Sequence, residues 1–268
     1  MQLGQLRLLF IQEELLDSSI MPFLQTIMND HDISPRLFLV LVEGDLNAYL
    51  SNKANQKDFD YKLWRMFKHY EQDNDGSLTV QNIHQFLKRM YGSGIDPVLP
   101  TFSASADSLT YNGTALFKHD RYVDIASDED DQIFQMLDHS SFLRAITIPE
   151  LKVALGNVTT NVDISFSDDF SKASFHTVLK GWISEYRGKK DIMNEHDLNK
   201  LTEEIEGYLK KRTESFLAQL QEKRVYPFKD GPNRFRFLHA SVDEKRWEES
   251  WPAMDIDVQY QVHFVDRG

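Results

Sequence analysis

The segment KLWRMFKHYEQDNDGSLTVQNIHQFLKR, residues 62–89, decides the fold that the sequence predicts. Apolar residues recur at helical spacing on each side of a polar loop, so each flank has one apolar face. These residues are Leu63, Met66, Phe67 and Tyr70 before the loop, and Ile83, Phe86, Leu87 and Met90 after it. The pattern predicts a helix, a loop and a second helix, with both apolar faces available for packing.

The polar loop resembles the calcium loop of the EF-hand superfamily, a 12-residue segment of alternating oxygen ligands with a sharp turn at a glycine. Gly76 stands at the turn position, and Leu78 stands at the apolar position that follows it. The resemblance implies that the protein binds calcium, Ca2+, as a cofactor. Its candidate metal ligands are Glu71, Asp73, Asp75, the backbone carbonyl of Ser77, Thr79 and Asn82.

Two of these ligand positions depart from the family pattern. Glu71 stands where the family has Asp, and Asn82 stands where the family has a Glu that binds calcium through both of its oxygens. An amide offers one neutral oxygen in place of two charged ones, so the calcium affinity falls. Two interpretations stay open: a weak calcium site, or a metal-free turn that Gly76 and its Asp and Asn neighbours form without an ion.

Weaker copies of the same unit are predicted elsewhere in the chain. The segments at Ile33-Ser34, Ile146-Thr147 and Ile192-Met193 each follow an apolar stripe at helical spacing. Their ligand positions have decayed, although the second keeps Asp138 and Glu150. We therefore expect a mainly α-helical fold of paired EF-hand-like helix-loop-helix units, with a small β-hairpin insertion and a C-terminal β-ribbon.

This interpretation divides the chain into four segments. Residues 1–95 form an N-terminal EF-hand-like pair, and residues 96–126 form a connection that carries the β-hairpin. Residues 127–224 form a degenerate EF-hand-like pair with a long helix, and residues 225–268 form a C-terminal β extension.

Two short signals support the middle segments. Asn112-Gly113 lies between two runs of apolar and β-branched residues, which is typical of a tight hairpin turn. Ser127 precedes the acidic run from Asp128 to Asp131, which predicts a capped helix start more than a metal cluster, because carboxylates favour the positive end of a helix.

Two longer patterns describe the end of the chain. Residues 197–223 predict one long helix with an apolar stripe that is either core or a partner-binding face. Alternating apolar residues at 256–264, together with the segment at 234–238, predict the β-ribbon. Its apolar face either closes the core or forms a protein interface.

Composition limits the possible partners and chemistry. The 42 acidic residues outnumber the 30 basic ones and give a formal net charge of −12, so the average surface field repels nucleic acid and favours cations or basic partners. The absence of cysteine excludes disulfides, thiol catalysis and cysteine-bound metal. No membrane span and no good signal core are expected from the sequence, which favours a cytoplasmic location, or the secretory pathway if a signal peptide was removed.

No phosphate loop, nucleophile elbow or zinc-protease motif is present in the sequence. The function expected is therefore that of a noncatalytic, EF-hand-like regulatory protein that binds a protein partner. Two other classes stay open: a structural component of a larger assembly without metal, and an enzyme or the regulatory subunit of one.

Overall fold

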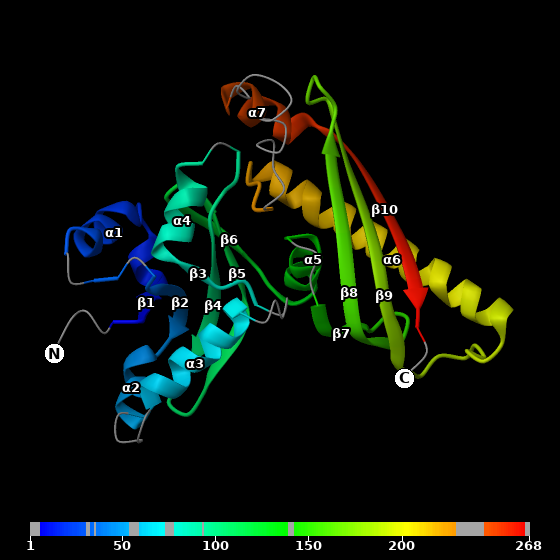
Figure 1. Cartoon of the computed structure of the whole chain (residues 1–268), viewed down its shortest axis with the longest axis horizontal. Helices are drawn as coiled ribbons and strands as arrows, with labels where there is room; N and C mark the ends of the chain where they lie inside the picture. Colours follow the sequence, from blue (N-terminus) through cyan, green and yellow to red (C-terminus); the bar gives the residue numbers. More distant parts are fainter. Residues whose placement is uncertain are drawn as a thin grey trace. The chain divides into compact units, whose positions relative to one another are not determined.

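A computed structural model describes residues 6–30, 33–34, 36–53, 59–72, 78–92, 94–138, 142–228 and 244–265. It divides into two compact units, which we describe separately: unit 1 takes the described residues up to Asp131, and unit 2 takes those from Gln132 onward. Each unit is built on its own β-sheet (Figure 1). The fold is therefore mixed α/β, and the mainly α-helical prediction is wrong.

Unit 1 has a central sheet with the strand order β1-β2-β4-β5-β6, and a short strand, β3, also pairs with β2. The first three strands of this order run parallel, while β5 and β6 are antiparallel to their neighbours. The strands are β1 (Leu8–Gln12), β2 (Phe38–Gly44), β3 (Gln81–Asn82), β4 (Val98–Ala104), β5 (Leu109–Lys118) and β6 (Arg121–Ala126). The helices are η2 (Glu13–Leu16), α1 (Met21–Met28), α2 (Leu46–Lys53), α3 (Phe59–Gln72) and α4 (Ile83–Met90).

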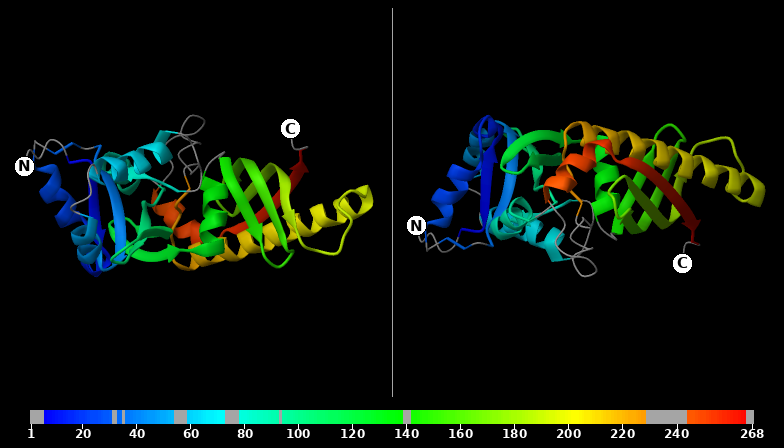
Figure 2. Two further views of the ribbon diagram at one scale, coloured as in Figure 1. Left: turned by 90° about the horizontal axis from the view of Figure 1, so that it is seen from below. Right: turned by 90° about the horizontal axis from the view of Figure 1, so that it is seen from above.

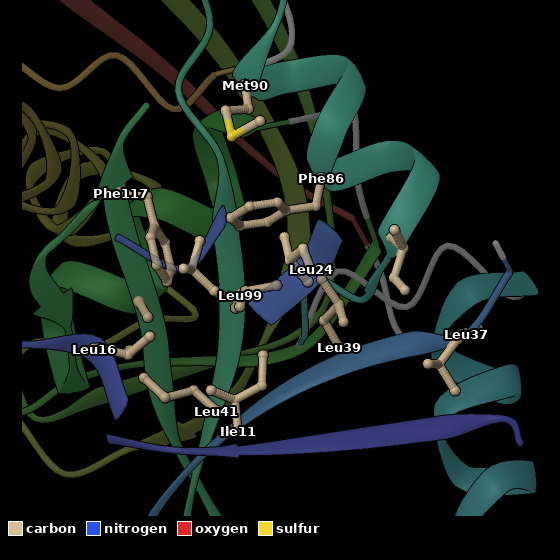
Figure 3. Packing of buried hydrophobic residues seen from close by; sticks show 13 residues of the cluster. Ile11, Leu16, Leu24, Leu37, Leu39, Leu41, Phe86, Met90, Leu99 and Phe117 are labelled. Atoms are coloured by element: carbon tan, nitrogen blue, oxygen red, sulfur yellow. The ribbon is translucent and has the colours of Figure 1, made fainter. Parts of the chain in front are cut away.

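Helices cover both faces of the unit 1 sheet. The continuous apolar run of β2, FLVLV, is buried along its length, as expected for a strand that is covered on both sides. On one face, η2, α1 and α4 enclose a core that includes Leu39, Leu99 and Phe86 (Figure 3). On the other face, α2 and α3 enclose a second core that includes Val40, Phe67 and Phe102. The unit is a three-layer sandwich.

The EF-hand prediction fails on this arrangement. The two helices that flank the predicted calcium loop, α3 and α4, pack on opposite faces of the sheet, because Phe67 of α3 and Phe86 of α4 belong to different cores. In an EF-hand the two helices would share one helix-loop-helix core. The other predicted units fail as well, since residues 38–44 form β2, and Ile146-Thr147 lies inside a strand.

Unit 2 contains an antiparallel meander, β7-β8-β9, extended by β10, which runs parallel to β9. The long helix α6 lies across one face of this sheet (Figures 1 and 2). α5 begins directly after Ser127, as predicted, and crosses from unit 1 into unit 2 between Asp131 and Gln132. The elements are α5 (Asp128–Asp138), β7 (Phe142–Ile148), β8 (Val153–Phe166), β9 (Lys172–Tyr186), α6 (Glu195–Glu222), α7 (Glu244–Ser250), η4 (Trp251–Ala253) and β10 (Asp255–Phe264).

α6 confirms the predicted long helix and its apolar stripe. Leu201, Ile205 and Leu209 are buried, and Asn194 caps the helix by accepting a hydrogen bond from the backbone N of Asp197. The strands beneath it alternate between buried and exposed residues, which is typical of a sheet that is covered on one face only. The stripe of α6 therefore serves as core.

Aromatic side chains close one end of unit 2. The ring of Tyr226 lies 4.9 Å from that of Trp251 and 5.1 Å from that of Trp247, in both cases edge to face. The indole Nε1 of Trp251 donates to the carbonyl of Val225 at 3.0 Å, so its one polar atom is satisfied inside the cluster. These contacts fasten α7 and η4 to the segment that follows α6, and the ring of Phe166 on β8, 5.1 Å from that of Trp247, joins them to the sheet.

Two predicted β features need correction. Asn112-Gly113 does not form a hairpin turn, because β5 runs through both residues. Gly113 is required there for space: a Cβ atom would lie 2.1 Å from the carbonyl oxygen of Ala126 on β6. Of the predicted C-terminal ribbon, residues 255–264 form a strand that pairs with β9 as part of the unit 2 sheet, whereas the segment at 234–238 lies outside the described residues.

Candidate functional site

The structure describes only some of the predicted calcium ligands. Asp73, Asp75 and Ser77 lie outside the described residues, while Glu71 lies near the end of α3. Thr79 is buried before β3. The calcium site, and Ca2+ as a cofactor, therefore stay predictions.

Asn82 has a structural role that the sequence interpretation missed. Its side-chain Oδ1 accepts a hydrogen bond from the backbone N of Gln85 at 2.9 Å, and the Oε1 of Gln85 accepts one from the backbone N of Asn82 at 2.9 Å. This reciprocal pair is a capping box that starts α4. The spacing of Asn82 and Gln85 was the available signal, because a cap residue followed three positions later by Gln marks a helix start.

A group of acidic side chains in unit 1 lies near the carboxyl ends of β1 and β2. Glu13 follows β1 directly, and Glu43 is the second-last residue of β2, so the two carboxylates come from neighbouring parallel strands. In sheets of this kind, the carboxyl ends of parallel strands are a common location for binding sites. We call Glu13, Glu43, Tyr122 and Asp124 the acidic end of unit 1.

Hydrogen bonds hold Glu43 in place. Its Oε2 accepts from the Nδ2 of Asn112 at 2.7 Å and from the Oγ of Ser103 at 3.5 Å. Ser103 belongs to β4 and Asn112 to β5, so the sheet itself orients this carboxylate. The bond from Asn112 also accounts for an Asn at a position that the sequence suggested was a turn.

The acidic groups influence one another's ionisation. Burial raises the pKa of Glu13, and the neighbouring carboxylates of Glu43, Glu14 and Asp17 raise that pKa further. Burial together with Glu13, Asp124 and Glu43 raises the pKa of Tyr122 to about 12. Tyr122 therefore stays protonated at neutral pH and cannot act there as a general base.

The acidic end of unit 1 is suited to binding a positively charged group more than to catalysis. Four acidic or phenolic groups near one another favour a cation or a basic side chain and disfavour anions. Within the described ranges, no three His, Asp or Glu side chains are grouped closely enough to hold a metal ion. The adjoining start of α2 offers no anion site either, because the carboxylate of Asp45 accepts from the backbone N of Ala48 at 2.8 Å.

Membrane insertion through a helix finds no support in the described part of the chain. None of its helices has both the length and the apolar character that crossing a bilayer requires. The longest, α6, has 28 residues but carries charges along its exposed side.

The fold and the polar end of unit 1 define a two-unit α/β protein whose first unit has parallel strands between helix layers. Comparison with known proteins then identifies the family of the chain. Residues 1–104 match the family described as "Spore germination protein N-terminal domain", and residues 112–268 match the family described as "Spore germination B3/GerAC like, C-terminal". The chain belongs to the spore germination B3/GerAC-like family, and the EF-hand assignment is thereby wrong.

Two curated relatives agree with this assignment. The chain is 22% identical to the spore germination protein GerQC of Bacillus cereus, over 100% of this chain and 76% of that protein. It is 29% identical to the putative spore germination protein YfkR of Bacillus subtilis (strain 168), over 66% of this chain and 50% of that protein. Neither name refers to calcium.

A solved structure shares the fold. The crystal structure of the GerBC protein superposes with a TM-score of 0.64 at 14% sequence identity, and the match covers 97% of this chain and 79% of that one. At this level of identity the likeness concerns the fold alone. It extends over both units.

Proposed function

We propose that this protein acts in spore germination as a noncatalytic, protein-binding subunit of a multi-subunit germination receptor. The observation that carries the proposal is that two germination-family matches together span residues 1–104 and 112–268. The function expected from the sequence, an EF-hand-like calcium regulator, is contradicted by the same matches. The expectation of a protein partner is kept, and the family sets its context.

Two features of the described residues support a binding role. Unit 1 has a well-packed core on each face of its sheet, and the polar groups of the acidic end favour basic partners over a reaction. The family descriptions name spore germination and no catalysed reaction. The cytoplasmic location expected from the sequence is a separate prediction, and nothing in the proposal depends on it.

Co-isolation tests the proposal. A tagged copy replaces the chain at its own locus in the spore former that encodes it, and complexes are isolated from dormant spores after mild cross-linking. We expect other germination proteins in comparable amount to the chain, and none from an untagged strain. Isolation of the chain without any germination protein would contradict the proposal.

Matched variants locate the contact. If the acidic end binds a basic partner, Glu13→Gln/Glu43→Gln reduces the recovery of partner proteins at low salt, and the difference from the unaltered chain shrinks as salt is raised, because salt screens the charges that the variant removes. Asp163→Asn is the control, because Asp163 is an exposed carboxylate on β8 of unit 2. Equal recovery with both variants would place the contact elsewhere on the protein.

A further inference from the structure

β10 forms one edge of the unit 2 sheet. It pairs with β9, and among the described residues no strand pairs with its outer side (Figure 1). Two hydrogen bonds fix the direction of its backbone groups: the N of Asp255 donates to the carbonyl of Ser171, and the N of Val265 donates to that of Gly181. Odd-numbered residues therefore direct their N–H and C=O toward β9, and even-numbered residues direct theirs outward.

The side chains of β10 follow the same alternation. Val258, Tyr260 and Val262 are buried on the side of α6, while Gln259 and Gln261 are exposed on the opposite face. A ten-residue edge with outward N–H and C=O groups is a pairing surface for another strand. The surface consists of the outward backbone groups of Ile256, Val258, Tyr260, Val262 and Phe264.

At least one of these outward groups is engaged within the described part of unit 2. The N of Val262 donates to Oε1 of Glu206 on α6 at 2.8 Å. The same bond confirms that even-numbered residues face outward. Glu206 is half-buried, and its side chain has several rotatable bonds, so its carboxylate can release this N–H to an incoming strand.

The exposed face of β10 is acidic at its start and lies beside a basic residue of β9 near its end. Asp255 and Asp257 lie at its start, whereas His263 lies near its end, beside Lys180 of β9. An antiparallel neighbour with the same sequence would bring its acidic start to the end that carries His263 and Lys180. Opposite charges placed across an antiparallel pair stabilise it.

We propose that the outer edge of β10 pairs with β10 of a second copy of this chain, antiparallel, with Tyr260 opposite the same residue of the second copy. In this register even-numbered residues face even-numbered ones, so the outward backbone groups match. Asp257 faces His263 of the second copy, and Gln259 faces Gln261. The inference rests on the geometry of unit 2 and is independent of the proposed role in germination.

Sedimentation equilibrium of the purified chain over a wide concentration range gives the first test, and residue-resolved amide hydrogen exchange gives the second. We expect a reversible dimer, with the N–H groups of Ile256, Val258, Tyr260 and Phe264 becoming protected as the dimer forms. The N–H of Val262 provides an internal reference, because Glu206 protects it in the monomer as well.

Charge variants then test the register. Asp257→Lys removes two cross-strand pairs per dimer and should weaken dimerisation about tenfold. The double variant Asp257→Lys/His263→Asp restores opposite charges across the interface and should recover the dimer. Asp163→Lys makes the same charge change two strands away on the same face and should leave dimerisation unchanged. Circular dichroism of each variant checks that it folds.

Three outcomes would overturn the proposal. The first is a monomer at every concentration, and the second is a dimer that Asp257→Lys and Asp163→Lys affect equally. The third is protection of the even-numbered N–H groups only when another germination protein is added, which would assign the edge to that protein.

Discussion

The ring of Phe86 on α4 meets the ring of Phe117 on β5 edge to face, with 5.3 Å between the ring centroids and 87° between the planes. Both rings are fully buried. The contact joins a helix to the central sheet of unit 1, where an EF-hand would join that helix to a second helix (Figure 3). The second helix of the predicted calcium-binding unit, α4, therefore serves to cover one face of the unit 1 sheet.

Phe86→Ala tests that role. Removing the ring leaves a cavity between α4 and the sheet, and we expect a loss of about 3–5 kcal/mol in the free energy of unfolding. Urea denaturation measures the loss. Tyr91→Ala is the control just after α4, because Tyr91 is 72% exposed and its removal should change stability little. A similar small effect of both variants would contradict the packing described.

The capping role of Asn82 gives a second prediction. Asn82→Ala leaves the backbone N of Gln85 without its acceptor and should lower the free energy of unfolding by about 1 kcal/mol. Asn82→Asp keeps an oxygen acceptor at the helix start and should be close to neutral. If Asn82→Ala and Asn82→Asp have the same stability in urea, the cap does not hold α4.

Gly207 lies within α6 and is exposed, and a Cβ atom there would meet nothing within 4 Å. Gly207→Ala should therefore raise the free energy of unfolding by about 0.5–1 kcal/mol, because alanine restricts the unfolded chain and favours a helix. Thermal unfolding followed by circular dichroism measures the gain. Destabilisation would show that the bare helix surface at Gly207 is in contact with another part of the protein.

Tyr260 makes stability depend on pH in the alkaline range. Burial raises its pKa to about 12, although a hydrogen bond with Thr213 at 2.8 Å lowers the pKa in part. A raised pKa means that the folded state favours the protonated phenol. Its contribution to stability is therefore complete below the unfolded pKa of about 10 and is lost as the pH rises toward 12.

Tyr260→Phe isolates this contribution. The variant should lose about 1 kcal/mol at neutral pH, since Thr213 loses its partner, and its stability should fall less steeply than that of the unaltered chain between pH 10 and 12. Urea denaturation at a series of pH values gives both quantities. Parallel stability curves for the two proteins would contradict burial of the phenol.

The parts of the fold that the sequence predicted are those with a strong local pattern. The stripe of Leu201, Ile205 and Leu209 has a helical period over many residues, and the alternation from Ile256 to Phe264 has the period of a strand. Both elements appear in the structure where they were expected. Local periodicity was sufficient there because each element has one buried face.

The tertiary arrangement could not be read from the same patterns. An apolar stripe such as that of α3 has the same spacing whether it packs on a helix or on a sheet. The run FLVLV at 38–42 has no period and cannot be distinguished from a buried helix segment by pattern alone. Leu179 and Ile183 stand four residues apart, as in a helix, yet they lie in β9, where the register with β8 shifts.

The acidic end of unit 1 was beyond sequence reasoning for a similar reason. Glu13 and Glu43 are far from Tyr122 and Asp124 in the chain, and they influence Tyr122 only because the fold of unit 1 brings the ends of β1 and β2 near β6, although β4 and β5 separate β2 from β6 in the sheet. Such a site becomes visible when the strand order is known.

Germination of spores that lack this chain tests the central claim most directly. Deletion of its gene should slow or abolish the response of dormant spores to at least one germinant, measured as loss of refractility, and a wild-type copy at another locus should restore the rate. Unchanged germination with every germinant that acts on the parent strain would contradict a role of the chain in germination.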